Sequence, residues 1–545
     1  MNKPRTGNGF AVFCHGRDTV LWRCMQFLRK LAEKSAKMKM DLQKGGVSME
    51  RYIMAVDQGT TSSRAILFDR HGRIAGMAQK ELTNSYPHPG WVEQDASEIW
   101  ASVAGVMMEV LARFGIAPHQ VAAIGITNQR ETTVIWEKES GRPIAPAIVW
   151  QSRQSEAYCS ALREAGKEEW IRKKTGLQLD PYFSASKIRF LLDQTHAQSR
   201  AERGELCFGT IDSWLVWKLS HGRTHVSDVS NASRTMLMNL ETLAFDEELL
   251  KLWDIPICMM PRICDSSGIL AMSDLLGTPV PIAALAGDQQ AALFGQACFE
   301  KGSVKNTYGT GCFLLMNTGD QIVRSSTGLI SSVGWRIGNE VSYVLEGSVF
   351  VAGAAVQWLR DGLRLIQTSA ESEERASSAE SVADSGGVIV VPAFTGLGAP
   401  YWKPNVRGAM FGLTRGTTQE HIIRATLESL AFQSMDVLQA MEEDLGVRID
   451  SLKADGGASR NHFLMQFQSD LLDVEVVCPD IAETTALGAA ALAGLAVGFW
   501  KDQEEIRRLT QHVSRYHPRM GEEEREKLMK GWKKAVAAAA AFDIV

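Results

Sequence analysis

The sequence lacks the features that would mark its 545 residues as a membrane, nucleic-acid-binding or disulfide-rich protein. No apolar run approaches the ~20 residues that a membrane-spanning helix needs, and a formal net charge of −5 gives no overall basic field for nucleic acid. None of the nine cysteines forms a Cys-x-x-Cys pair, which is typical of reduced thiols in a cytosol. We therefore expect a cytoplasmic protein with no stable membrane insertion and no nucleic-acid partner.

Several catalytic fingerprints are missing as well. The chain has no Gly-x-x-x-x-Gly-Lys-Ser/Thr phosphate loop, no His-Glu-x-x-His motif, no nucleophile elbow and no dinucleotide glycine fingerprint. A nucleotide site of the phosphate-loop kind is therefore not supported.

The pattern that is present indicates an α/β protein with two large domains, because a chain of this length exceeds one core. Strand-like runs alternate with helical apolar spacing. The strand-like runs are 121–126, 132–136, 281–286, 388–392 and 451–455, and the helical patterns are 97–114, 354–365 and 421–441. An Ala-rich closing helix is expected at 535–542, and we place the two domains at 49–297 and 298–545.

The first 48 residues differ in composition from the rest of the chain. Residues 1–48 hold ten Lys or Arg and three Asp or Glu, and they end near Lys44-Gly45-Gly46. Purine-rich codons of a bacterial ribosome-binding site would encode that tripeptide a few residues before Met49. We interpret 1–48 as a non-native translated leader or a disordered extension. A basic targeting peptide and an amphipathic surface helix are the alternatives.

The most informative segment, 52–69, reads as a strand, a turn of Gly and hydroxyl residues, and a second strand. Such a turn offers small side chains and free backbone N–H groups that can cradle a polyphosphate. Asp57, at the end of the first strand, is placed to hold Mg²⁺ directly or through water. An ordinary hairpin with a polar turn is the alternative.

A second segment, 301–316, repeats this pattern of strand, Gly/Thr turn and strand about 250 residues later. A duplicated architecture, with one phosphate hairpin in each half and the nucleotide in the cleft between them, fits both copies. Two unrelated hairpins would give the same pattern.

Arg130 and Glu131 follow a strand, and their adjacent opposite charges suit the vicinal hydroxyls of a polyol. The glutamate accepts hydrogen bonds and the arginine donates them. A solvated ion pair in a loop is the alternative.

Asp288 lies where a strand runs straight into a helix. One carboxylate at this turn could act as the general base that takes a proton from an attacking alcohol. Gln289 beside it could orient the substrate. A plain helix N-cap is the alternative.

The run 455–461 follows another strand and contains two glycines. Gly457 would permit close backbone approach to a ring or ribose, and Asn461 could reach an adenine. A tight turn with an N-cap is the alternative.

Taken together, these segments resemble the FGGY carbohydrate kinases over about residues 52–537. The motifs that carry the resemblance are 57–64, 125–133, 287–295 and the two signature segments 182–194 and 408–428. Phe190 departs conservatively from the Trp usual in the first signature.

The resemblance implies an α/β, two-domain actin/hexokinase-like (ribonuclease H-like) fold with an interdomain ATP cleft. It also implies ATP- and Mg²⁺-dependent phosphorylation of glycerol to sn-glycerol 3-phosphate, with Asp288 as base, in a homodimer or homotetramer. The implied glycerol contacts are Arg130, Glu131, Trp150, Tyr182, Asp288, Gln289 and Phe313. The implied ATP contacts are Thr60, Thr61, Ser62, Arg64, Thr310, Gly353, Gln357, Gly457 and Asn461, with Mg²⁺ near Asp57 and Asp288.

Two other functions stay open at this point. One is a sibling kinase for another polyol or a pentulose, and the other is an actin- or chaperone-like ATPase that acts on a protein partner. The chain after Asn461 looks too short for a peptide- or polymer-binding module, which disfavours the second.

One departure concerns regulation. Family members inhibited by fructose 1,6-bisphosphate carry an Arg in a Gly-Thr-Arg-Ile-Pro-Ile stretch, whereas this chain has Pro279 at that position. A proline side chain cannot clamp a phosphate, so we expect weak or absent inhibition by that effector.

Overall fold

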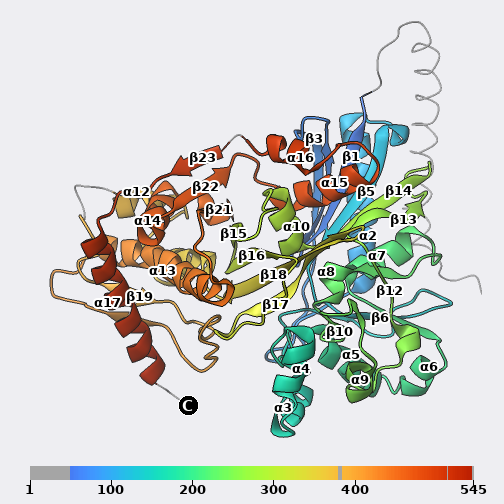
Figure 1. The fold of residues 1–545 in the computed structure, drawn as a ribbon, viewed down its shortest axis with the longest axis horizontal. Coiled ribbons are helices and arrows are strands. Elements are labelled where there is room, and N and C mark those ends of the chain that lie inside the picture. Colours follow the sequence, from blue (N-terminus) through green and yellow to red (C-terminus); the bar gives the residue numbers. More distant parts are fainter. Residues whose placement is uncertain (1–49, 378–382, 512, 543–545) are drawn as a thin grey trace, which may run out of the picture.

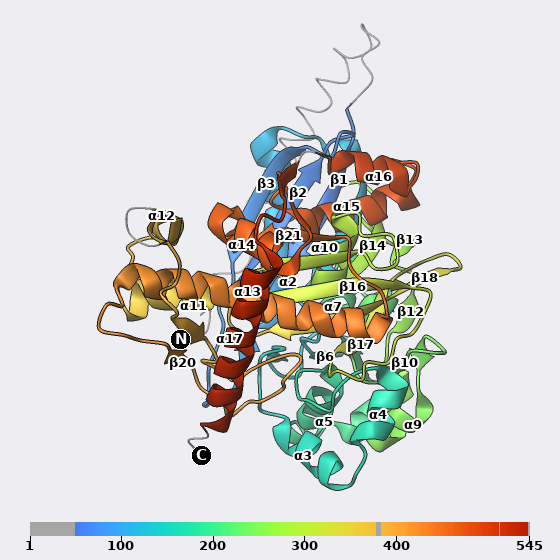
Figure 2. The ribbon, with the colours of Figure 1, turned by 60° about the vertical axis from the view of Figure 1, so that its left-hand side comes forward.

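The computed structural model describes residues 50–377, 383–511 and 513–542. These residues form two large mixed sheets with helices on their faces, and Figures 1 and 2 show the earlier half of the chain, blue to green, beside the later half, yellow to red. The leader expected at 1–48 lies outside the described residues.

The first sheet has six strands in the order β13-β14-β5-β1-β2-β3. They are β1 (Tyr52–Gln58), β2 (Ser62–Phe68), β3 (Ile74–Glu81), β5 (Val121–Asn128), β13 (Ser267–Ser273) and β14 (Val280–Gly287). β1, β5 and β14 run parallel, and β5 is buried at every position, as expected for central parallel strands. Helix α2 (Ala96–Phe114) packs on β2 and β3. Asp95 caps its start and Gly115, in the left-handed conformation, ends it.

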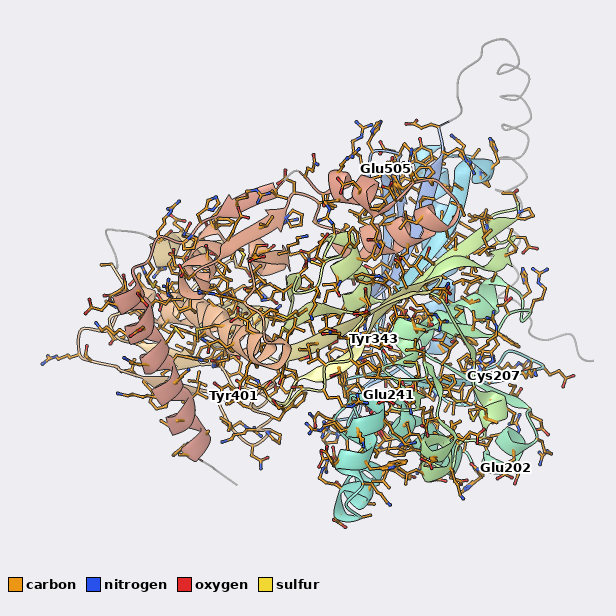
Figure 3. All side chains as sticks on the ribbon, in the orientation of Figure 1. Glu202, Cys207, Glu241, Tyr343, Tyr401 and Glu505 are labelled. Atoms are coloured by element: carbon orange, nitrogen blue, oxygen red, sulfur yellow. The ribbon has the colours of Figure 1, made fainter. Side chains whose placement is uncertain are left out.

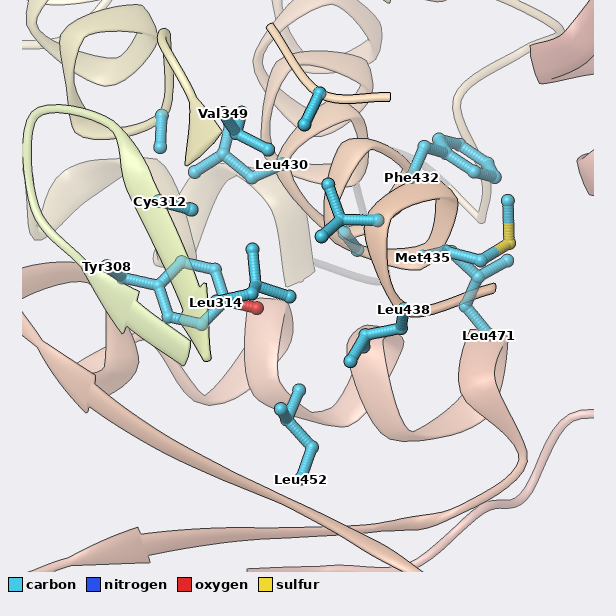
Figure 4. Close-up of a cluster of buried hydrophobic side chains, with 14 of the residues drawn as sticks. Tyr308, Cys312, Leu314, Val349, Leu430, Phe432, Met435, Leu438, Leu452 and Leu471 are labelled. Carbon is cyan, nitrogen blue, oxygen red and sulfur yellow. The ribbon is translucent and has the colours of Figure 1, made fainter. Parts of the chain in front are cut away.

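The second sheet has seven strands in the order β17-β18-β16-β15-β21-β22-β23. They are β15 (Val304–Tyr308), β16 (Cys312–Gly319), β17 (Ile330–Ile337), β18 (Glu340–Val349), β21 (Ser451–Gly456), β22 (Glu475–Pro479) and β23 (Val513–Tyr516). Helices α13 (Gln419–Leu445) and α14 (His462–Leu472) pack against each other and against this sheet. Figure 4 shows the resulting core, where Leu314 lies near Leu430 and Leu438. The buried Tyr308 hydroxyl donates to Gln468 Oε1 at 2.6 Å.

The two sheets share one strand topology. From β3 to β13 the pairings run antiparallel, antiparallel, parallel, parallel and antiparallel. From β18 to β23 they run in the same sequence, and β17 is one additional strand. The predicted repeat of the hairpin is therefore part of a repeat of the whole sheet.

Shorter elements surround the sheets. In the first half they are β4 (Glu93–Gln94), β6 (Val134–Glu137), β7 (Ala147–Ile148), β8 (Leu206–Gly209), β9 (Val226–Asp228), β10 (Met238–Asn239), β11 (Ala244–Phe245), β12 (Arg262–Cys264), α3 (Glu156–Glu164), α4 (Glu168–Thr175), α5 (Ser184–Gln194), α6 (Gln198–Glu202), α7 (Ile211–Leu219), α8 (Val229–Ala232), α9 (Glu247–Leu252) and two 3₁₀ turns, Pro118–Gln120 and Ile257–Met259. In the second half they are β19 (Ile389–Val391), β20 (Ala409–Phe411), α11 (Gly353–Gln357), α12 (Glu371–Ser377), α16 (Gln503–Leu509), α17 (Glu522–Ala541), a π-helical turn, Trp358–Gly362, and a 3₁₀ turn, Gly457–Arg460.

Two helices cross between the sheets, as Figure 1 shows: α10 (Asp288–Gly295) and α15 (Thr484–Ala496). α10 follows the first sheet and contacts β15 and β16 of the second, whereas α15 follows the second sheet and packs on β1, β5 and β14 of the first. The helices touch through glycines. A Cβ on Gly295 would lie 2.0 Å from the Thr484 carbonyl oxygen, and one on Gly488 would lie 1.8 Å from that of Ala291.

The halves also meet at the edge of the second sheet. The Tyr343 hydroxyl of β18 donates to the Leu240 carbonyl at 3.1 Å. The next residue, Glu241, pairs with Arg324 at 2.6 Å, and Figure 3 labels Tyr343 and Glu241 in this region. Contacts between the halves are thus not confined to the helix pair.

Two predicted helices differ from the structure. The pattern at 354–365 forms the short α11 and then the π-helical turn, in which Leu363 N–H bonds to Trp358 O. The closing helix begins at Glu522 rather than near residue 535: its acidic first turn suits a helix N-terminus, and its buried positions begin only at Trp532. Across the described residues, none of the helices combines the length and the apolar character that crossing a membrane requires.

Candidate active site

Three parallel strands of the first sheet end side by side. Gln58 of β1 is the Cα partner of Asn128 of β5, and Asn128 is the partner of Gly287 of β14. Because parallel strands end at one edge of a sheet, the segments that follow them meet there. The predicted site residues gathered at this edge are Asp57, Arg130, Glu131, Asp288 and Gln289.

The first hairpin closes as predicted, with Gly59 N–H donating to the Ser62 carbonyl at 2.9 Å. Thr61 is exposed at its tip and Ser62 is buried. Burial raises the pKa of Asp57 to about 7, with the Asp288 charge adding to the rise and the facing Arg64 opposing it. The turn therefore lies beside a carboxyl group that another positive charge would stabilise as the anion.

Asp288 is the first residue of α10, directly after β14. Its Oδ1 lies 3.2 Å from Arg130 Nε, and its side chain is 32% exposed. Gly287 occupies the N-cap position, so the N-cap alternative for Asp288 is wrong. Gln289 donates to Asp288 from its backbone N–H at 2.8 Å and from its side-chain Nε2 at 3.3 Å.

Arg130 and Glu131 are only 3% and 1% exposed, so the alternative of a solvated ion pair is wrong. Arg130 Nε and Glu131 Oε1 are 3.9 Å apart, and each residue has a closer partner. Arg130 donates from both terminal nitrogens to Glu346, at 2.5 and 2.9 Å, and Arg234 Nε donates to Glu131 at 2.6 Å. Glu131 has a φ of 57°, a strained conformation of the kind found at functional sites.

Arg234 and Glu346 are site residues that sequence reasoning missed. Both are fully buried, and Arg234 Nη2 lies 3.2 Å from Glu346 Oε1. Burial acts to raise the pKa of Glu346, but the charges of Arg130 and Arg234 outweigh it and lower that pKa to about 2. Glu346 follows the apolar run 343–345 in the buried part of β18, and a charge at that place was the signal that could have found it.

Three aromatic residues from distant segments form one group. The Trp150 ring lies 5.6 Å from that of Tyr182 and 6.3 Å from that of Phe313, between ring centres. Tyr182 also packs on the Arg234 guanidinium, 5.4 Å away, and Trp150 Nε1 donates to Thr60 Oγ1 at 2.9 Å. The aromatic group therefore borders both the charged cluster and the first hairpin.

The second hairpin and the segment after β18 lie together. Gly353 N–H donates to the Gly309 carbonyl at 3.0 Å, and Ala354 N–H donates to the Thr310 carbonyl at 3.1 Å. A Cβ on Gly353 would lie 2.6 Å from the Gly309 oxygen, so only glycine fits there without a shift. Gln357, one turn further on, is exposed. Thr310, Gly353 and Gln357 are thus near one another.

The Gly-Gly turn lies beside the same hairpin, because Gly456 is the Cα partner of Tyr308. Gly456 has a φ of 89°, which favours glycine, and Gly457 begins the 3₁₀ turn. Asn461 Oδ1 accepts the Leu464 N–H at 2.9 Å, so the N-cap alternative holds for this residue. Arg64 reaches this half through a 2.6 Å ion pair with Glu483.

Comparison of the sequence with known protein families identifies the family of this chain. The profile of the N-terminal domain of the FGGY family of carbohydrate kinases matches residues 52–295, and that of the C-terminal domain matches residues 304–497. The chain belongs to the FGGY family of carbohydrate kinases. This FGGY chain is 58% identical over 498 residues to a glycerol kinase of Geobacillus sp. (strain WCH70), covering 91% of this chain and 100% of the relative. It is 59% identical over 497 residues to a glycerol kinase of Listeria monocytogenes serovar 1/2a (strain ATCC BAA-679 / EGD-e), covering 90% and 99%.

Solved structures agree on the fold of the FGGY chain. A Plasmodium falciparum glycerol kinase crystallised with ADP superposes with a TM-score of 0.85 at 34% identity, covering 90% of this chain and 98% of that one. A gluconate kinase from Lactobacillus acidophilus superposes with a TM-score of 0.81 at 22% identity, covering 91% and 99%, and supports the fold alone. The expected two-domain actin/hexokinase-like FGGY fold is confirmed.

Proposed function

We propose that this FGGY kinase transfers the γ-phosphoryl group of ATP to glycerol, forming sn-glycerol 3-phosphate and ADP. Glycerol kinases at 58–59% identity cover nearly the whole chain and support this activity. The geometric observation that carries it is the 3.2 Å contact between Asp288 and Arg130 at the edge where three parallel strands end.

Asp288 is the proposed general base. It is partly exposed and begins a helix, so it can meet a substrate hydroxyl while its Oδ1 contacts Arg130 Nε. As the hydroxyl oxygen bonds to the γ-phosphorus, its proton passes to Asp288 and the bond to the ADP oxygen breaks. Arg130, Glu131, Tyr182 and Gln289 would hold the other hydroxyls.

The remaining assignments follow the geometry. Trp150 and Phe313 would pack on the carbon skeleton, because both belong to the aromatic group beside the charged cluster. ATP would lie between the two hairpins, which offer backbone N–H groups to its phosphates. The proposed ATP contacts are Thr60, Thr61, Ser62, Arg64, Thr310, Gly353, Gln357, Gly457 and Asn461.

A magnesium ion fits this site. Burial and the Asp288 charge raise the pKa of Asp57 to about 7, as expected for two carboxyl groups that a cation would bridge. The described residues hold no cluster of three His, Cys, Asp or Glu able to bind a metal by themselves. Asp57 and Asp288 would therefore share Mg²⁺ with phosphate oxygens and water, and the ion would neutralise phosphate charge.

Further proposals concern organisation and location. We place an N-terminal domain at 49–297 and a C-terminal, nucleotide-binding domain at 298–545, in a homodimer or homotetramer in the cytoplasm. The repeated sheet topology supports two domains. The seven cysteines within the described residues are free, which suits a reducing compartment. Light scattering would test the oligomeric state.

A coupled assay of ADP release, with and without glycerol, tests the activity. We expect release that depends on glycerol, Mg²⁺ and ATP. Xylulose, gluconate and other polyols in the same assay test the sibling-kinase alternative. ADP release that protein, but not glycerol, stimulates would contradict the proposal.

A further inference from the structure

Lys305 is a fully buried lysine beside the proposed active site that the mechanism above does not use. It lies in β15 and donates three hydrogen bonds from Nζ: to Gln289 Oε1, to Thr307 Oγ1 at 2.9 Å and to the Phe313 carbonyl at 3.2 Å. These use all three donors of an ammonium group, and every acceptor is neutral. Burial lowers the pKa of Lys305 to about 8, although the charges of Asp455 and Asp288 act to raise it. A buried ammonium without a contacting carboxylate costs stability, so its position needs another explanation.

The contact with Gln289 fixes the orientation of an amide group. An ammonium only donates, so the atom of Gln289 that faces Lys305 is the carbonyl oxygen. The amide nitrogen must then point the other way, and it lies 3.3 Å from Asp288 Oδ2. With the amide reversed, its oxygen would face the Asp288 carboxylate and repel it.

The same ammonium also ties together the two strands of the second hairpin. Thr307 of β15 and Phe313 of β16 are Cα partners, and Lys305 contacts both residues. Phe313 belongs to the aromatic group next to Trp150. Lys305 therefore links one phosphate hairpin, one wall of the substrate site and the residue next to the proposed base.

A second lysine shows that the docking of α10 on the second sheet does not by itself explain the position of Lys305. Lys453 of β21 is the Cα partner of Lys305, and its Nζ donates to the Gln296 and Ala297 carbonyls at 2.7 and 3.0 Å. Lys453 thus meets the C-terminal end of α10, where a cation is favourable. Lys305 meets the opposite end of α10, where the helix dipole disfavours a cation.

We propose that Lys305 is a positioning residue that fixes the amide of Gln289 in the orientation that donates toward Asp288 and the substrate. It does so from the second sheet, so Gln289 is set correctly only when the second hairpin stands against α10. The inference rests on the proposed kinase function and deepens it.

The test is a double-mutant cycle with glycerol as the varied substrate. We expect Lys305→Met and Gln289→Ala each to lower kcat/KM for glycerol by ~10- to 100-fold, with KM for ATP changed less than ~3-fold. The double variant should lose no more than Gln289→Ala alone, because Lys305 acts through Gln289. Losses that multiply would overturn the proposal, since Lys305 would then act independently of Gln289.

The matched control is Lys453→Met. It removes the register partner of Lys305 and the contacts with the other end of α10, so it should lower the melting temperature but leave kcat/KM within ~3-fold of wild type. If Lys453→Met reduced kcat/KM as strongly as Lys305→Met, the effect would be a general consequence of undocking α10, and the proposal would be wrong.

Lys305→Gln covers the case in which the methionine variant does not fold. Its amide NH₂ can still donate to Gln289 without a buried charge, so it should retain more activity than Lys305→Met. Wild-type activity in a folded Lys305→Met protein that binds ADP normally would refute the positioning role. Failure of the kinase function itself would appear separately, as wild-type ADP release that does not respond to glycerol.

Discussion

The indole Nε1 of Trp150 donates a hydrogen bond to Oγ1 of Thr60 at 2.9 Å. This bond connects the aromatic group of the proposed glycerol site to the turn of the first hairpin, which would hold the nucleotide phosphates. A substitution in the aromatic group should therefore change the binding of ATP as well as that of glycerol.

We expect Trp150→Phe, which keeps a ring but removes the donor, to raise KM for ATP by ~3- to 10-fold as well as KM for glycerol. Initial-rate kinetics with each substrate varied would measure both. In a Thr60→Val background the same change should no longer affect KM for ATP, because the acceptor is already gone. An unchanged KM for ATP in Trp150→Phe would show that this hydrogen bond does not couple the two substrate sites.

The proposed base is tested by Asp288→Ala. Its loss should lower kcat by about 10²- to 10⁴-fold, because no other group takes the hydroxyl proton, while ATP affinity changes modestly. Asp288→Asn, which keeps the shape, should be comparably slow. Single-turnover kinetics and ADP titration separate the two effects, and near-normal turnover in either variant would refute the assignment.

The buried cluster predicts a large effect at Glu346. Replacing it by Gln leaves the Arg130 and Arg234 charges without their shared partner, which typically costs 3–5 kcal/mol for a buried pair. We expect a lower melting temperature and a KM for glycerol raised by at least ~10-fold. Glu340→Gln, at the exposed start of the same strand, is the control and should change neither the melting temperature nor KM for glycerol. A Glu346→Gln protein of wild-type stability would show that the charged cluster does not need this carboxylate.

Stability should depend on pH through Asp436. Burial raises the pKa of Asp436 to about 6, although Trp532 Nε1 and the Tyr401 hydroxyl donate to it at 2.6 and 2.9 Å. The folded protein therefore binds this proton more tightly than the unfolded chain, so the free energy of unfolding should fall as pH rises from about 3 to about 7, by about 3 kcal/mol from this group. Urea unfolding of wild type and Asp436→Asn across that range measures the difference. The same change of unfolding free energy with pH in both proteins would contradict the role of Asp436.

Regulation gives a prediction of its own. Pro279 is exposed in the turn between β13 and β14 and cannot bind a phosphate through its side chain. Titration with fructose 1,6-bisphosphate should leave the rate of glycerol phosphorylation nearly unchanged. Tight inhibition would mean that other residues bind this effector.

The sequence predicted what depends on local pattern. The hairpin around Asp57, the strand before Asp288 and the Gly-Gly turn each lie within a short segment, so alternation and turn residues reveal them. Tyr182, Trp150 and Gln357 were proposed from the resemblance alone, because single residues in turns or at the end of a short helix carry no periodic signal.

Arg234, Glu346 and Lys305 were not found by either route. Glu346 lies 216 residues from the Arg130 that it contacts, and Lys305 opens a run of three polar residues in β15, so its polarity does not stand out. Their importance comes from partners that only the packed fold supplies. The Arg130–Glu131 pair shows the same limit, since the sequence indicated a polyol contact for both residues but not the buried partners, Glu346 and Arg234, that each contacts in the fold.

The crossing of α10 and α15 depends on the absence of side chains at two positions. Gly295 and Gly488 let one backbone rest against the other with no side chains wedged between them. The backbones of the two helices therefore lie closer together here than any larger residue would allow. A methyl group at either position would collide with the facing backbone and push the two helices apart.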